Sequence, residues 1–268
     1  MNRMKIRTGW FGIALTALLL PGLVAAQENG NVPETKAPAA SQAAPAPAAP
    51  AHITGDERAR SDWPWLGRFE EENLKLGPPA PGEDRVVFMG DSITEGWHLD
   101  GSFPGKPYLN RGISGQTTPQ MVLRFHQDVV DLKPKVVIIL AGINDIAGNT
   151  GPMTLEQTED NLAAMAEMAT TNHIKVVLCS VLPAYDFPWS PGKMPAPKVV
   201  AVNEWMKAYA QGNGHIYVDY YSAMKDDRGG LPPSLSQDGV HPLPAGYAIM
   251  APLAEVGIER ALKTGTKE

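Results

Sequence analysis

Short apolar runs alternate with longer amphipathic stretches along most of the chain, and this alternation predicts its secondary structure. The apolar runs are short, several are β-branched throughout, and strands covered on both faces of a sheet have this composition. The runs expected to form strands are residues 85–89, 108–111, 136–140, 176–181 and 215–219.

The stretches between these runs repeat their apolar residues at the three- and four-residue spacing of a helix face. The expected helices span residues 62–76, 119–132, 154–171, 198–210 and 244–262. Thr154 stands where a threonine caps a helix N-terminus. Strands that alternate with helices through short connections predict an α/β fold, a three-layer α/β/α sandwich around a mostly parallel, five-stranded sheet. The loops after the strands then meet at one edge of the sheet, where such folds bind ligands.

Residues 1–26 have the layout of a secretory signal peptide. A basic start precedes an apolar run over residues 10–24, and small residues follow up to Ala26. The run is shorter than the roughly 20 residues that a membrane-spanning helix needs. We therefore predict cleavage after Ala26, export to a periplasm or out of the cell, and no membrane insertion after cleavage. An uncleaved membrane anchor is the alternative.

Residues 27–55 are rich in alanine and proline and include the run Ala-Ala-Pro-Ala-Pro-Ala-Ala-Pro that ends at Pro50. A segment with so little to bury is expected to form an extended, partly polyproline linker. Residues 56–268 remain as one folded domain, and their number suffices for a substantial core.

Charge and cysteine content exclude some classes of function. The formal net charge of -6 falls to about -9 without the first 26 residues, which carry three basic side chains and no acid. An acidic protein of this kind does not favour nucleic acid as a partner. Cys179 is the sole cysteine, so no intramolecular disulfide can form, and its strand context predicts a buried, inert thiol.

Four short motifs carry side chains suited to acyl transfer, and the first three each follow a predicted strand. They are Gly90-Asp91-Ser92, Gly112-Ile113-Ser114-Gly115, Gly142-Ile143-Asn144-Asp145 and Asp238-Gly239-Val240-His241. Ser92 is the candidate nucleophile, His241 the candidate base, and Asp238 the carboxylate that orients the base. Taken singly, these motifs have ordinary interpretations, such as a helix cap at Ser92 and a turn at Asp238.

Donors for a developing oxyanion are also present. The backbone N–H groups of Ser92 and Gly115 and the side-chain amide of Asn144 are the candidates. The serine does not lie in the G-x-S-x-G elbow of α/β-hydrolases, because Asp91 precedes it and Thr94 replaces the second glycine. We expect Asp91 to brace the turn around the nucleophile.

In their order and spacing, the four motifs resemble the SGNH hydrolase superfamily, also called GDSL-type esterases and lipases. The resemblance extends over about residues 85–250, and Ile93 stands where the name-giving leucine would be. It implies the flavodoxin-like SGNH hydrolase fold for residues 56–268. It also implies Ser92, His241 and Asp238 as catalytic triad and Ser92, Gly115 and Asn144 as oxyanion hole.

Residues 110–118 and 132–137 are similar to the platelet-activating-factor acetylhydrolase-like branch of this superfamily. The similarity implies a secreted serine esterase that hydrolyses short, acetyl-type esters through an acyl-serine intermediate, with O-acetyl groups on carbohydrate as the expected substrate. The partner is then a small-molecule or glycan ester. No cofactor is implied, and the histidines lack the spacing of metal ligands.

Aromatic residues near the motifs are candidates for substrate binding. Trp97 follows the serine motif closely, and the proline-rich segment 183–197 contains Tyr185, Phe187 and Trp189. Packing of the same side chains onto the domain is the competing interpretation.

Three other functions stay open at this stage. A lysophospholipase or thioesterase of the same superfamily would prefer acyl chains of eight carbons or more, whereas an acetylesterase would not. A glycan-binding module on an inactive hydrolase scaffold would bind without turnover, and a structural wall protein would do neither. The sequence does not indicate the oligomeric state.

Overall fold

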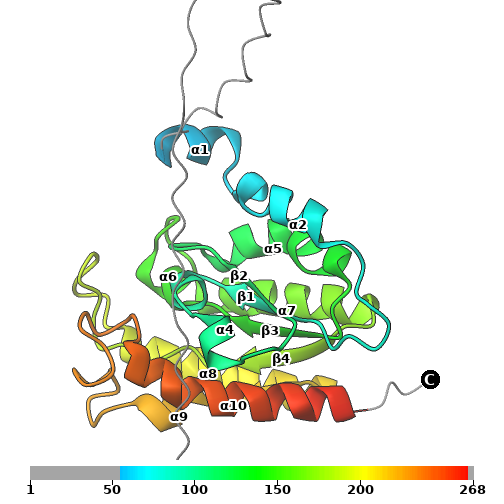
Figure 1. Cartoon of the computed structure of the whole chain (residues 1–268). Coiled ribbons are helices and arrows are strands. Elements are labelled where there is room, and N and C mark those ends of the chain that lie inside the picture. The colour runs from blue at the N-terminus through cyan, green and yellow to red at the C-terminus, as the bar shows by residue number, and fades with distance from the viewer. Residues whose placement is uncertain (1–54, 265–268) are drawn as a thin grey trace, which may run out of the picture. The chain divides into compact units, whose positions relative to one another are not determined.

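The computed structural model describes residues 55–264, and a five-stranded sheet lies at their centre (Figure 1). The strands are β1 (Val86–Gly90), β2 (Tyr108–Gly112), β3 (Val136–Leu140), β4 (Lys175–Cys179) and β5 (Ile216–Val218). They pair in the order β2-β1-β3-β4-β5, and every pair is parallel. The α/β class and the five strands are confirmed, and the sheet is parallel throughout.

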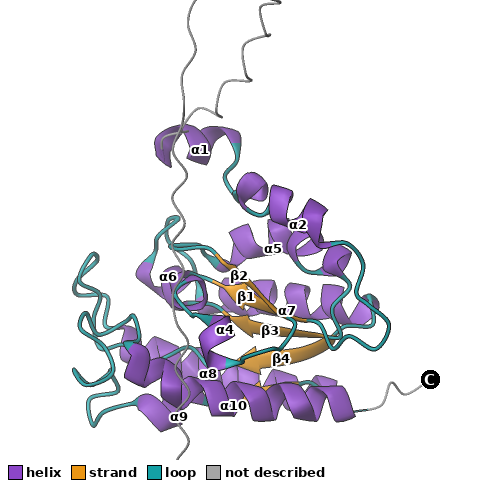
Figure 2. Cartoon of the chain, in the orientation of Figure 1, coloured by secondary structure: helices purple, strands orange, loops and turns teal. Residues whose placement is uncertain are grey.

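Four long helices cover the sheet, and Figure 2 shows the strands between them. They are α5 (Thr118–Asp128), α7 (Leu155–Thr171), α8 (Pro195–Asn213) and α10 (Pro244–Lys263). Helix α10 packs on β3, β4 and β5, while α7 packs beside α5 and α8 on the opposite face (Figure 1). The short helices are α1 (Gly55–Ser61), α2 (Glu70–Leu76), α3 (Ser92–Glu95), α4 (Leu99–Ser102), α6 (Ile143–Ala147) and α9 (Tyr220–Met224). These layers form the three-layer sandwich.

Burial on both faces of the sheet explains the fully apolar strands. All five residues of β1 and of β3 are buried, and Leu162, Met165 and Ala166 of α7 pack into the same core. Each large aliphatic side chain removed from water contributes about 1.5–3 kcal/mol to stability. Helix α7 begins where the sequence predicted, because Thr154 accepts a hydrogen bond from the backbone N–H of Gln157.

The predicted helix over residues 62–76 is wrong in its first half. The chain there forms a short 3₁₀ turn, η1 (Leu66–Arg68), before α2 begins at Glu70. Trp65 has a φ of 57°, which no right-handed helix contains, and the Asp62 carboxylate accepts hydrogen bonds from the backbone N–H groups of Leu66 and Gly67. A second 3₁₀ turn, η2 (Val130–Leu132), likewise replaces the end of the helix predicted over 119–132.

The predicted signal peptide (1–26) and all of the predicted linker (27–55) except Gly55 lie outside the described residues. Among residues 55–264, none of the helices combines the length and the apolar character needed to cross a bilayer. Cys179 is buried in β4, and burial raises the pKa of its thiol to about 12.

Gly112 lets the end of β2 approach the turn after the nucleophile motif. A Cβ atom on Gly112 would overlap the backbone of Thr94 and Glu95, which cannot move aside as a flexible side chain can. We expect Gly112→Ala to lower the free energy of unfolding by roughly 3 kcal/mol in urea denaturation. The control is Gly212→Ala in α8, where a Cβ meets nothing within 4 Å. Equal stability of the two variants would contradict this packing.

Candidate active site

The four motifs lie together at one edge of the sheet. The motif with Ser92 follows β1, the motif with Gly115 follows β2, and the motif with Asn144 follows β3. The register aligns the ends of these strands, since Gly90 pairs with both Gly112 and Leu140. The fourth motif lies in the segment that enters α10.

Ser92, His241 and Asp238 form a continuous chain of hydrogen bonds. The Ser92 Oγ lies 2.9 Å from His241 Nε2, and His241 Nδ1 lies 2.6 Å from Asp238 Oδ2. A proton shared at the second contact fixes the imidazole tautomer that leaves Nε2 free to accept the serine proton. The arrangement can therefore generate a serine nucleophile.

The Asp238 carboxylate is held in place by its own loop. Its Oδ1 accepts hydrogen bonds from the backbone N–H groups of His241 (2.8 Å) and Val240 (2.9 Å), and from Ser236 Oγ (3.0 Å). Burial raises the pKa of this carboxyl, but the bonds from His241 and Val240 outweigh it and lower the pKa to about 2. Asp238 is therefore a carboxylate at any pH where imidazole acts as a base.

Asp91 directly precedes Ser92 in the chain and is fully buried. Its Oδ1 accepts the backbone N–H of Ile93 at 3.0 Å, so Asp91 caps α3 and fixes the turn that carries Ser92. Its Oδ2 has no hydrogen-bond partner within residues 55–264. Burial raises the pKa of Asp91 to about 7, and the nearby charge of Asp145 acts in the same direction.

Gly115 and Asn144 reach the same edge from the neighbouring loops. Gly115 is exposed with a φ of +76°, a conformation in which glycine is favoured, and a Cβ there would meet nothing within 4 Å. Asn144 is buried, and its Nδ2 donates to the backbone carbonyl of Gln116 at 3.0 Å. One of its two amide hydrogens is thus left for another acceptor.

The model of the GDSL-like lipase/acylhydrolase family matches residues 88–249, which include all of these motifs. The chain belongs to this family. It is a carboxylic ester hydrolase with the fold of the SGNH superfamily, as the sequence predicted.

Two curated relatives align with this chain over different shares of their own length. The acetylxylan esterase of Geobacillus stearothermophilus is 26% identical over 214 residues, which cover 66% of this chain and 95% of the esterase. The lipoprotein YqeF of Bacillus subtilis is 33% identical over 129 residues, 41% of this chain. The match spans about half of that lipoprotein, 53% of its length.

A solved structure agrees over more of the acylhydrolase. The crystal structure of a GDSL-like lipase from Bacteroides thetaiotaomicron is 45% identical and superposes with a TM-score of 0.72. The alignment covers 75% of this chain and 100% of the lipase.

The four aromatic candidates of the acylhydrolase separate into two pairs. Trp97 is only 3% exposed and packs against Phe88, Phe103 and other core rings, and Phe187 is fully buried. The expectation that Trp97 and Phe187 contact substrate is therefore wrong, because the core covers both side chains. Tyr185 and Trp189 are 55% and 44% exposed. Trp189 also lies beside the base, with its ring centre 5.9 Å from that of His241.

Asn149 is a residue near the site that the sequence did not indicate. Its Nδ2 lies 2.8 Å from Asn144 Oδ1 and 3.3 Å from the carbonyl oxygen of Gly115, and its Oδ1 accepts from Trp189 Nε1 at 3.1 Å. An asparagine five residues after Asn144 carries no motif of its own. The preceding Gly148 marks a helix end, which was the available signal for a turn there.

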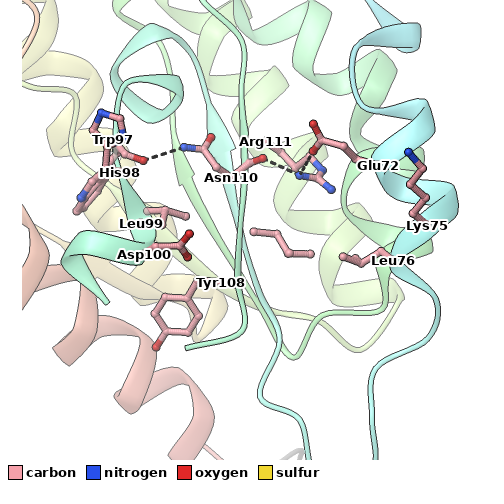
Figure 3. Close-up of a pocket in the computed structure, with 11 residues that line it drawn as sticks. Glu72, Lys75, Leu76, Trp97, His98, Leu99, Asp100, Tyr108, Asn110 and Arg111 are labelled. Atoms are coloured by element: carbon pink, nitrogen blue, oxygen red, sulfur yellow. Dashed lines mark hydrogen bonds and ion pairs between the residues drawn. The ribbon is translucent and has the colours of Figure 1, made fainter. Parts of the chain in front are cut away.

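A cavity of about 580 Å³ lies away from these motifs, along the outer edge of β2 between α2 and α4 (Figure 3). None of the catalytic candidates lines it. Asn110 and Arg111 of β2 line its wall. The Arg111 guanidinium donates a hydrogen bond to the backbone carbonyl of Asn110 at 2.7 Å. No residue of the four motifs contributes to the lining of this cavity. Residues 55–264 also bring no three His, Cys, Asp or Glu side chains together in a way that could hold a metal ion.

Proposed function

We propose that this acylhydrolase is an exported esterase that removes short, acetyl-type acyl groups, with O-acetylated carbohydrate as its substrate. The observation that carries the catalytic part is the hydrogen-bond chain from Ser92 through His241 to Asp238. The 26% identity to an acetylxylan esterase over 95% of that enzyme supports the substrate class. The layout of residues 1–26 supports export.

Acyl transfer begins at the serine. Ser92 Oγ attacks the ester carbonyl carbon while His241 Nε2 takes the hydroxyl proton, and Asp238 stabilises the imidazolium that forms. The C–O bond to the alcohol breaks as His241 returns the proton to the leaving oxygen. A water molecule, activated by the same imidazole, then releases the acyl group from Ser92 as a carboxylic acid.

The oxyanion of each tetrahedral intermediate needs donors that are fixed before the reaction. The backbone N–H groups of Ser92 and Gly115 and the unused amide hydrogen of Asn144 are the proposed donors. Removal of one such donor lowers the rate by about 10²–10³. Because these groups lie on three different loops, the hole exists only in the folded sheet.

The test is an acyl-length series measured on the full chain. We expect p-nitrophenyl acetate to be cleaved with a higher kcat/KM than the butyrate, and the butyrate with a higher kcat/KM than the octanoate. A parallel assay of acetate release from acetylated xylo-oligosaccharides tests whether the alcohol part of the ester is a carbohydrate. A maximum at octanoate would replace the proposal with a lysophospholipase or thioesterase, and glycan binding without turnover would replace it with a binding module.

Trp189 is the proposed surface for the carbohydrate. Its ring is exposed beside His241, where it can contact the alcohol half of a bound ester. We expect Trp189→Ala to lower kcat/KM for acetylated xylo-oligosaccharides about tenfold, the cost of truncating an aromatic contact. That tenfold loss corresponds to about 1.4 kcal/mol of contact energy. The kcat/KM for p-nitrophenyl acetate should change by less than about threefold, because this ester carries no carbohydrate for the ring to contact. Equal losses on both substrates would remove Trp189 from substrate selection.

A further inference from the structure

Asn149 connects the proposed oxyanion hole to the aromatic residue beside the base. Its side chain contacts three groups: the amide oxygen of Asn144, the carbonyl of Gly115 and the indole N–H of Trp189. A primary amide has two hydrogens and one oxygen, so these contacts occupy both the donors and the acceptor of Asn149. The contacts define its orientation, because a flipped amide would face acceptors with its oxygen.

The amide group of Asn144 is thereby held at both ends. Its nitrogen donates to the Gln116 carbonyl at 3.0 Å, and its oxygen accepts from Asn149 at 2.8 Å. With only the first bond, the amide could rotate about its Cβ–Cγ bond within the range that one hydrogen bond allows. With both, the second amide hydrogen has a fixed direction, which a preorganised oxyanion donor requires.

The contacts of the Asn149 side chain are separable from those of its backbone. The backbone N–H of Asn149 donates to the carbonyl of Asn144 at 3.0 Å, which closes the end of α6. The neighbouring backbone N–H of Gly148 donates to the same carbonyl. An alanine at position 149 keeps this turn and removes only the side-chain contacts.

We propose that Asn149 is a positioning residue that orients the Asn144 amide for the oxyanion and couples it to Trp189. The proposal rests on the function proposed above, because it assigns Asn144 a role in the same transition state. Trp189 contacts both Asn149 and the ring of His241. The two donor contacts of Asn149, to Asn144 and to Gly115, do not involve Trp189, so they remain when the indole is removed.

Kinetics of Asn149→Ala on p-nitrophenyl acetate give the first test. We expect kcat to fall about tenfold with KM within about twofold, because the affected bond forms only in the transition state. In an Asn144→Ala background, the same substitution should lower kcat by less than about twofold, since its target is gone. Equal losses in both backgrounds, or a change in KM alone, would overturn the positioning role.

Two further variants sharpen this result. Asn149→Asp keeps an acceptor for Trp189 but places a carboxylate against Asn144 Oδ1, so it should not restore the rate lost in Asn149→Ala. Asn213→Ala removes an exposed asparagine that donates a single hydrogen bond at the end of α8, and we expect no change in kcat. Full activity of Asn149→Asp would show that donation to Asn144 is irrelevant and would contradict the proposal.

A measurement without turnover separates this proposal from the proposed function. In ¹⁵N-labelled protein, the side-chain amide resonances of Asn144 are those lost in Asn144→Ala. We expect Asn149→Ala to shift and broaden them, and Asn213→Ala to leave them in place. Unchanged Asn144 resonances in Asn149→Ala would overturn the positioning role even in an active enzyme. If Asn149→Ala shows the expected shift but the wild type cleaves no ester, the proposed function is overturned instead.

Discussion

Ser92→Ala should lower kcat for p-nitrophenyl acetate by about 10⁴-fold or more, with an unchanged thermal unfolding midpoint. The serine oxygen lies 2.9 Å from His241 Nε2 and is the only hydroxyl bonded to that imidazole within residues 55–264. Without it the proposed acyl-enzyme cannot form, and the residual rate then comes from substrate binding and the proposed oxyanion donors. The substitution removes one oxygen atom from a half-buried side chain, so we expect little change in the free energy of unfolding.

Asp238→Asn and Ser222→Ala complete this experiment. Asp238→Asn leaves the loop able to fold but no longer stabilises the imidazolium, and we expect a loss of about 10⁴ in kcat. Ser222→Ala removes a hydroxyl whose hydrogen-bond partner among residues 55–264 is Asp219, at the start of α9. It should leave kcat unchanged. Retained turnover in Ser92→Ala would contradict the serine mechanism.

Asp91→Asn should change how stability depends on pH. Burial raises the folded-state pKa of Asp91 to about 7, whereas the ordinary value is 3.8. As pH rises through this interval, the unfolded chain releases the Asp91 proton before the folded protein does, so the folded state loses stability. The wild type should therefore lose up to about 4 kcal/mol relative to Asp91→Asn between pH 4 and pH 8, at 1.36 kcal/mol per pKa unit.

The quantity to compare is the difference in unfolding free energy between wild type and variant, measured in urea across this pH range. Constant effects of the asparagine, such as an unpaired buried N–H in place of the free Oδ2, cancel in that comparison. Asp100→Asn, on the exposed side of α4, controls for the removal of a surface carboxylate. A wild-type to Asp91→Asn difference that is flat in pH would show that Asp91 does not hold its proton in the fold.

Local pattern was sufficient for the elements that are regular over their whole length. Strand β3 coincides with its predicted range, 136–140, because a short run of five apolar residues, four of them β-branched, favours a strand covered on both faces. Helix α7 begins after its predicted cap at Thr154. The stretch 62–76 failed because its apolar spacing is helical while Asp62 and the left-handed Trp65 close a turn within it. A periodic pattern of apolar residues does not reveal which backbone N–H groups a polar side chain will accept hydrogen bonds from.

The residue types and their order in the sequence also indicated the class of reaction at the site. The types and order of Ser92, Gly115, Asn144, Asp238 and His241 indicate acyl transfer, since few other reactions need that set of groups. Their predicted position after parallel strands follows from the topology of α/β sheets. The roles assigned to them remain proposals for the experiments above.

Sequence alone determined the fold class, the strands and long helices, and the residues suited to the chemistry, because each is encoded in local spacing or residue type. Only the tertiary structure decided which aromatic side chains face solvent, placing Trp97 and Phe187 in the core and Trp189 beside His241. It also decided the burial that raises the pKa of Asp91 and the contacts of Asn149 with Asn144 and Trp189. Burial and contact between distant segments depend on how whole layers pack, and no stretch of sequence contains that information by itself.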